Sequence, residues 1–190
     1  MKTIALATTL LARMAALNPA LHSYTATMHA HVVLTTFPFL STEIVATYYH
    51  KDPDLDKLRI QSGLPLVAQG FSVIYPHIEP PSRWASLYTI DQTADDGSTT
   101  ALTLTPRTPG NVRQIDVTVN DATATIRSMR WEYENGGTAQ LEDHYSVVQG
   151  NTLVTSQTGR VDEPNYKGDI TATLSDYRVN PDLPDALFSQ

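Results

Sequence analysis

The chain has 190 residues, 41% of them hydrophobic, and its 13 lysines and arginines against 20 aspartates and glutamates give a formal net charge of -7. This length suits a single domain over residues 1–190, with a core large enough to fold without disulfides or a structural metal. Cysteine is absent, which excludes thiol nucleophiles, thiolate metal sites and disulfides. The negative charge repels phosphate backbones, so we expect no nucleic acid partner and a monomeric protein.

The first residues allow two interpretations. Lys2 precedes the apolar stretch 4–12, as a charged residue precedes the core of a signal peptide. However, Arg13 interrupts that stretch with no clean small-residue cleavage site before it, and the apolar residues recur at roughly helical spacing. We therefore expect a structural helix that ends by Pro19, and the residues alone leave export undecided.

Most of the remaining chain alternates between apolar and polar residues, as half-buried strands do. The clearest case is 24–34, where apolar residues occupy the even positions and mostly polar ones the odd positions. Further strands are expected at 41–50, 57–61, 102–105, 115–119, 129–134, 141–148, 152–161 and 169–178. Short reversals such as 135–137 and 149–151 predict an antiparallel up-and-down sheet. The polar segment 93–99 is interpreted as a loop.

A sheet this wide must curl, and its apolar face needs cover. We expect the N-terminal helix and the helical segment 64–88 to provide it. Within that segment, Phe71 and Ile74 belong to a short helix, and Ser82 is a candidate N-cap for a following helix that carries Trp84. The predicted fold class is mainly β with a few helices (α+β): a curved antiparallel sheet that forms an incomplete β-barrel with helices as its lid.

Titratable residues give little support for catalysis. His29 and His31 share one strand face without a third ligand at a metal-site spacing, so we predict no metal and no cofactor. Asp143 and Asp176 fall on the apolar parity, and we interpret both as carboxylates held by structural hydrogen bonds; a buried Asp143 would need a partner such as an arginine or a tyrosine hydroxyl. No nucleophile elbow, phosphate loop or zincin motif occurs, so we predict that the protein is not an enzyme. A hydrolase that uses Asp143 and Asp176 with a histidine stays open.

The apolar, aromatic inner face is the remaining candidate site. A strongly curved sheet of this width encloses more volume than two or three short helices fill, which favours a ligand cavity. The expected ligand-binding residues are Tyr24, Met28, Tyr48, Phe71, Ile74, Trp84, Leu102, Leu104, Met129, Trp131, Tyr133 and Tyr145. A fully packed interior with a structural or interaction role is the competing interpretation.

Three segments are similar to the LolA-like outer-membrane lipoprotein carrier and sorting proteins. Residues 18–26 resemble the family's passage from helix to first strand, 48–54 its aromatic-Lys-x-Pro strand end, and 102–107 its Leu-Thr-Pro-Lys element. The resemblance implies an incomplete barrel lidded by helices, whose inner face shields acyl chains in transit between membranes.

The chain departs from that family in two places. Carriers usually have an arginine just before the proline of the aromatic-Lys-x-Pro stretch, where it helps to hold the lid closed, and this chain has Asp52. The Pro-rich segment 64–84 replaces the family's Asp-Gly-Lys strand. A sorting-protein relative with a different cargo therefore fits better than a true carrier. The resemblance implies binding of lipid acyl chains or a lipidated protein, with membrane-associated partner proteins, in the periplasm or cell envelope.

Overall fold

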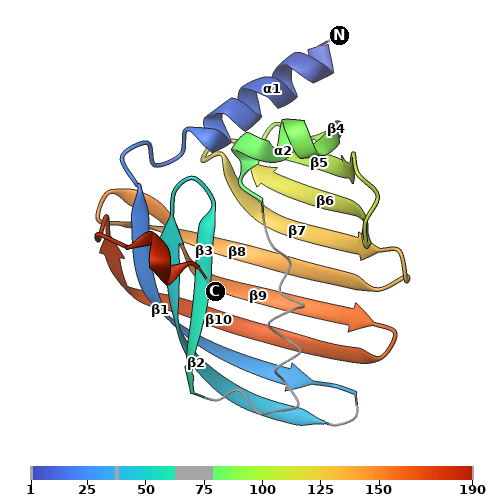
Figure 1. The fold of residues 1–190 in the computed structure, drawn as a ribbon. Coiled ribbons are helices and arrows are strands. Elements are labelled where there is room, and N and C mark those ends of the chain that lie inside the picture. Colours follow the sequence, from blue (N-terminus) through green and yellow to red (C-terminus); the bar gives the residue numbers. More distant parts are fainter. Residues whose placement is uncertain (1, 37–38, 63–78, 190) are drawn as a thin grey trace.

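The computed structural model describes residues 2–36, 39–62 and 79–189 (Figure 1). Its helices are α1 (Lys2–Ala15), α2 (Pro81–Leu87) and the short 3-10 helix η2 (Asp185–Leu187). Its strands are β1 (Ser23–Leu34), β2 (Leu40–Lys51), β3 (Leu55–Ser62), β4 (Tyr88–Asp95), β5 (Thr99–Pro106), β6 (Val112–Asn120), β7 (Thr125–Tyr133), β8 (Thr138–Val148), β9 (Asn151–Glu163) and β10 (Tyr166–Val179). Neither α1 nor α2 has the length and apolar character needed to cross a bilayer.

The strands of the described ranges form one 10-stranded antiparallel sheet in the order β3-β2-β1-β10-β9-β8-β7-β6-β5-β4. β1 pairs with β10 at the third and fourth places in this order, and β3 and β4 form the two edges of the sheet. Figure 1 shows that the sheet is strongly curved and that α1 and α2 lie at its β4 side. The expected incomplete barrel of antiparallel strands with helices is therefore confirmed.

The buried apolar residues form two separate clusters. The first, called here the helix-side cluster, joins both helices to β5, β6, β7, β8 and the β6–β7 turn: Leu10, Met14, Trp84, Leu102, Leu104, Ile115, Val117, Val119, Ala124, Met129, Trp131, Ala139 and Leu141. The second, called here the β1-side cluster, lies on β1, β2 and β10: Met28, Ala30, Val32, Ile44, Ala46 and Ala172. No described helix residue belongs to the β1-side cluster.

Gly159 of β9 lies where the two clusters meet. It pairs with Ile170 of β10 on one side and with Leu141 of β8 on the other. A Cβ atom at Gly159 would lie 2.7 Å from Ile170 Cγ2 and 3.6 Å from Leu141 Cδ1. Glycine at this position therefore lets the side chains of Ile170 and Leu141 approach each other across β9.

Two local predictions are wrong. Part of the expected loop 93–99 belongs to strand β4, which runs from Tyr88 to Asp95. The partly buried residues of β4 alternate with the exposed residues Thr89, Asp91 and Thr93. Because aspartate is depleted in strands, the sequence of β4 predicts a strand only weakly. Ser82 is not an N-cap, because α2 begins at Pro81 with no side-chain capping bond. Proline suits the first helical turn, where its missing N–H would have no partner in the helix.

Asp176 is exposed, which contradicts its expected place among the buried residues. The pairing of β1 with β10 shifts register between Thr25 and Thr27, and Asp176 has a φ of 52° in the left-handed region. A bulge of this kind changes the alternation of the strand, so Asp176 faces solvent and the next residue, Tyr177, is half-buried. The alternation of inward and outward side chains that includes Leu174 therefore does not continue past the bulge, and it cannot be used to predict the side on which Asp176 lies.

Candidate functional site

The helix-side cluster holds five of the expected ligand-binding residues in tightly packed positions. Trp84, Leu102, Leu104, Met129 and Trp131 are each no more than 3% exposed, and a sixth, Tyr133, packs partly buried against them. The indole N–H of Trp84 donates to the carbonyl oxygen of Glu79 at 2.6 Å. Side chains from α1 and α2 thus pack against β5, β6, β7 and β8 in this half of the inner face.

The β1-side cluster offers a different surface. Met28, another expected ligand-binding residue, lies here beside three alanines, Ala30, Ala46 and Ala172. The alanines are small, and Val32 and Ile44 complete the buried cluster on these three strands. Phe71 and Ile74, expected to cover the inner face, lie outside the described residues.

Tyr24 and Tyr48 belong to a group of aromatic side chains at the end of the β1-side cluster. The ring centroid of Tyr24 lies 5.7 Å from that of Tyr48, 5.7 Å from that of Tyr177 and 5.0 Å from that of His50. Burial raises the pKa of both Tyr24 and Tyr48, so both hydroxyls stay neutral at physiological pH. We call these four residues the tyrosine cluster.

Asp56 of β3 anchors the tyrosine cluster. Its Oδ1 accepts a hydrogen bond from the Tyr48 hydroxyl at 2.5 Å and lies 2.9 Å from Nδ1 of His50. The other ring nitrogen of His50 lies 3.4 Å from Oδ1 of Asp52. Burial lowers the pKa of His50, but the hydrogen bond and charge of Asp56, followed by those of Asp52, raise it more, so the net shift is upward.

Asp143 of β8 is a half-buried carboxylate on the same inner face. Gln157 donates to its Oδ1 at 2.8 Å, and the hydroxyl of Tyr145 lies 3.4 Å from its Oδ2. Burial raises the pKa of Asp143, and these two hydrogen bonds offset part of the shift. Of the two partner types expected, the structure shows the tyrosine hydroxyl, and Tyr145, an expected ligand-binding residue, contacts a polar group.

The strand registers place apolar and polar groups in one row. Ile44 of β2 pairs with Ala30, Ala30 with Ala172, Ala172 with Gln157, and Gln157 with Asp143. The row therefore passes from apolar side chains on β2, β1 and β10 to a polar pair on β9 and β8. An amphipathic ligand is the kind of molecule that matches such a lining.

The structure does not assemble the carboxylate pair that the hydrolase alternative requires. Asp176 is exposed and lies four residues beyond Ala172, the residue in register with Gln157 and Asp143. Four residues of strand span about 13 Å. Within the ranges that the structure describes, no group of three or more His, Asp or Glu side chains is placed to hold a metal ion.

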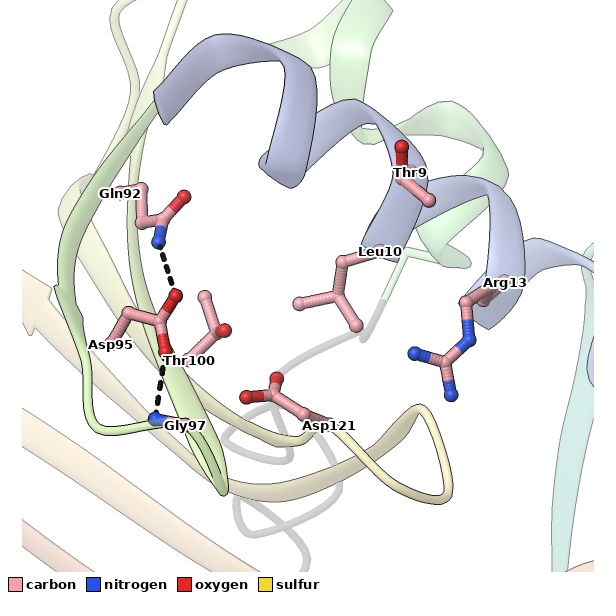
Figure 2. Close-up of a pocket in the computed structure, with 8 residues that line it drawn as sticks. All are labelled: Thr9, Leu10, Arg13, Gln92, Asp95, Gly97, Thr100 and Asp121. Carbon is pink, nitrogen blue, oxygen red and sulfur yellow. Dashed lines mark hydrogen bonds between the residues drawn. The ribbon is translucent and has the colours of Figure 1, made fainter. Parts of the chain in front are cut away.

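A pocket that the sequence did not indicate lies between α1 and the β4–β5 hairpin, with a volume of about 260 Å³. Figure 2 shows Leu10 of α1 facing this space from one side and Gln92 of β4 and Thr100 of β5 from the other, with Asp121 between them in this view. These residues come from four separate parts of the chain, so no local motif could reveal the pocket.

The open, curved antiparallel sheet with helices at one side is a half-barrel. Solved structures with the same architecture match the chain. No family model and no curated protein matches the sequence.

Several solved structures match nearly the whole chain, among them the following three. An outer membrane lipoprotein-sorting protein domain from Vibrio parahaemolyticus has 11% identity and a TM-score of 0.65, over 99% of this chain and 96% of that one. A DUF1329 family protein from Desulfovibrio piger has 14% identity and a TM-score of 0.63, over 99% and 98%. A LolA superfamily protein from Nitrosomonas europaea has 12% identity and a TM-score of 0.57, over 97% of each chain. The resemblance to the LolA-like fold is confirmed.

Proposed function

We propose that the protein binds lipid acyl chains, or the acyl chains of a lipidated protein, on the inner face beside the β1-side cluster. It acts as a binding protein without catalysis. The observation that supports the proposal is that three neighbouring strands, β1, β2 and β10, form one apolar cluster whose rows lead to the polar pair Gln157 and Asp143.

The tyrosine cluster and Asp143 give this site a polar end. A bound chain would lie beside the β1-side cluster, and the polar group that carries it would lie toward Tyr24 and Asp143. The names of two structural neighbours, a lipoprotein-sorting domain and a LolA superfamily protein, support this class of ligand. They also support a place in the periplasm or cell envelope and membrane-associated partner proteins.

Burial of methylenes supplies the binding free energy. Each methylene removed from water contributes about 0.8 kcal/mol, so ten give about 8 kcal/mol. The loss of translational and rotational freedom on association removes part of this. We therefore expect a dissociation constant between micromolar and submillimolar.

The first test is native mass spectrometry of the protein purified from its own host, together with titration of a dansyl-labelled fatty acid. We expect a lipid-bound mass and a saturable rise in fluorescence. A ligand-free mass together with no fluorescence response would exclude the proposal.

A pair of variants on one strand then locates the site. Met28→Gln puts an amide into the buried apolar lining, whereas His29→Gln changes the next residue, which is exposed on the opposite face. We expect Met28→Gln to weaken fatty acid binding about tenfold and His29→Gln to leave it unchanged, because a bound acyl chain would keep water away from the introduced amide, which costs about 1–3 kcal/mol. Equal effects of the two variants would place the ligand elsewhere. Circular dichroism checks that both variants are folded.

A further inference from the structure

Asp143 carries its charge on the inner face among neutral neighbours. The side-chain amide of Gln157 donates to its Oδ1 at 2.8 Å, and the hydroxyl of Tyr145 lies 3.4 Å from its Oδ2. Burial, the largest influence, raises the pKa of Asp143, and the smallest influence is that of His144, whose side chain is exposed. Within the described residues, the carboxylate therefore has hydrogen-bond donors beside it but no lysine or arginine that balances its charge.

The other charged groups at this end of the inner face do not supply a spare cation. His50 is positive when protonated, but its Nδ1 lies 2.9 Å from Oδ1 of Asp56 and its Nε2 lies 3.4 Å from Oδ1 of Asp52. Lys51, the next residue in the chain, donates to Oδ1 of Asp185 at 2.6 Å. Among the described residues, negative charge therefore exceeds positive charge at this end.

Asp143 lies close enough to Tyr24 to act on the tyrosine cluster. Burial is the main cause of the raised pKa of Tyr24, and the negative charges of Asp56 and Asp143 add to it. The strand register gives the same place, because Asp143 pairs with Gln157 and Gln157 pairs with Ala172 of the β1-side cluster. Asp143 and Gln157 are half-buried, so part of their surface stays accessible.

The chemistry of a carboxylate decides which ligand group suits this place. An ionised carboxylate accepts hydrogen bonds but cannot donate them, and its two oxygens accept about four. A carboxylate or phosphate on the ligand would add negative charge without supplying a donor, which is unfavourable beside a half-buried charge. An uncharged N–H or O–H group supplies the donor and adds no charge.

We propose that Asp143 determines which polar group the acyl-chain site accepts: an uncharged N–H or O–H donor is favoured, and a free carboxylate is disfavoured. The inference rests on the proposed acyl-chain binding and adds the class of the polar group. The ligand's N–H or O–H group donates to an oxygen of Asp143, and its chain lies beside the β1-side cluster. Acyl amides and acyl glycerols share this chemistry.

The test is displacement of the dansyl-labelled fatty acid from the whole protein by dodecanoate and by dodecanamide, which have the same chain. At about pH 8 both Asp143 and dodecanoate are ionised. We expect dodecanamide to displace the probe at about tenfold lower concentration, because its N–H groups donate to Asp143 whereas the carboxylate is repelled. Asp143→Asn should reduce this preference to about twofold or less, because the repulsion is removed.

Asp176→Asn is the matched control. It removes the same charge from an exposed position on β10, and asparagine tolerates the left-handed φ of 52° found there. We expect it to keep the wild-type preference. Comparison of the preference between variants also cancels the different solubilities of the two competitors in water. Circular dichroism checks that the variants are folded, and Asp143→Ser replaces Asp143→Asn if the latter is not.

Glycerol monododecanoate, which has the same chain and O–H donors, distinguishes the two sources of the donor. If it displaces the probe at lower concentration than dodecanamide, the ligand is of the acyl glycerol class, and the reverse order indicates an acyl amide. The inference is overturned, while acyl-chain binding stands, if dodecanoate and dodecanamide bind equally or if Asp143→Asn keeps the wild-type preference. If neither the probe nor any competitor binds, acyl-chain binding itself is refuted.

Discussion

Replacement of Gly159 by alanine tests how tightly the two apolar clusters meet. The new methyl would lie 2.7 Å from Ile170 Cγ2, about 1 Å inside the usual contact distance of 3.5–4.0 Å. Overpacking of this kind costs about 1–3 kcal/mol. Loss of glycine's freedom in the unfolded chain returns about 0.4–1 kcal/mol. We therefore expect Gly159→Ala to lower the free energy of unfolding by about 1–2 kcal/mol, measured by urea denaturation.

Gly110→Ala is the matched control. A Cβ at Gly110 meets no atom within 4 Å, and its φ lies outside the left-handed region, so we expect no loss or a gain of up to about 1 kcal/mol. A second check combines Gly159→Ala with Ile170→Ala, which removes the clashing methyl and should abolish the additional cost. If Gly159→Ala stabilises the protein as Gly110→Ala does, the close approach of the two clusters is refuted.

Three further predictions concern single side chains. Trp84→Ala should lower the free energy of unfolding by about 3–5 kcal/mol, because Trp84 is 1% exposed in the helix-side cluster. Ser82→Ala in the same helix should change it by less than about 0.5 kcal/mol, because Ser82 is exposed and makes no capping hydrogen bond. The pKa of His50 is raised in the folded protein, so its charge stabilises the fold fully below about pH 6.5, and this stability is lost as pH rises through the folded pKa. In His50→Gln, the free energy of unfolding measured with urea should change less over that pH range. Asp143 also has a raised pKa, so stability falls as pH rises above about 4, and Asp143→Asn should remove this fall and raise stability at pH 7.

Regular alternation made most of the sheet predictable. In β1, buried residues occupy the even positions from Ala26 to Leu34, and the expected hairpin turn 135–137 is present. Periodicity identified these strands because one side of the sheet is apolar along its length. β4 lacked that signal because it is an edge strand with exposed aspartates, and the place of Asp176 failed because a bulge changed the alternation.

The division of the expected inner face into separate groups was not predictable from the sequence. The sequence grouped Trp131, Met28 and Tyr24 on one apolar face, and the structure distributes them among the helix-side cluster, the β1-side cluster and the tyrosine cluster. Which residues pack under a helix depends on contacts between distant segments, such as Leu10 and Trp84 with β5 and β6. A single sequence contains no pattern that reports such contacts.

The pairing of the first strand with the last has a consequence for biosynthesis. During translation, β1 leaves the ribosome long before β10 exists, so one side of β1 stays without its hydrogen-bonding neighbour until the final strand is made. Met28 and Ala172 come from these two strands, so the β1-side cluster is completed only at the end of synthesis. Contacts between such distant segments form slowly, and we expect nascent chains truncated before β10 to expose this apolar surface and to be bound by chaperones.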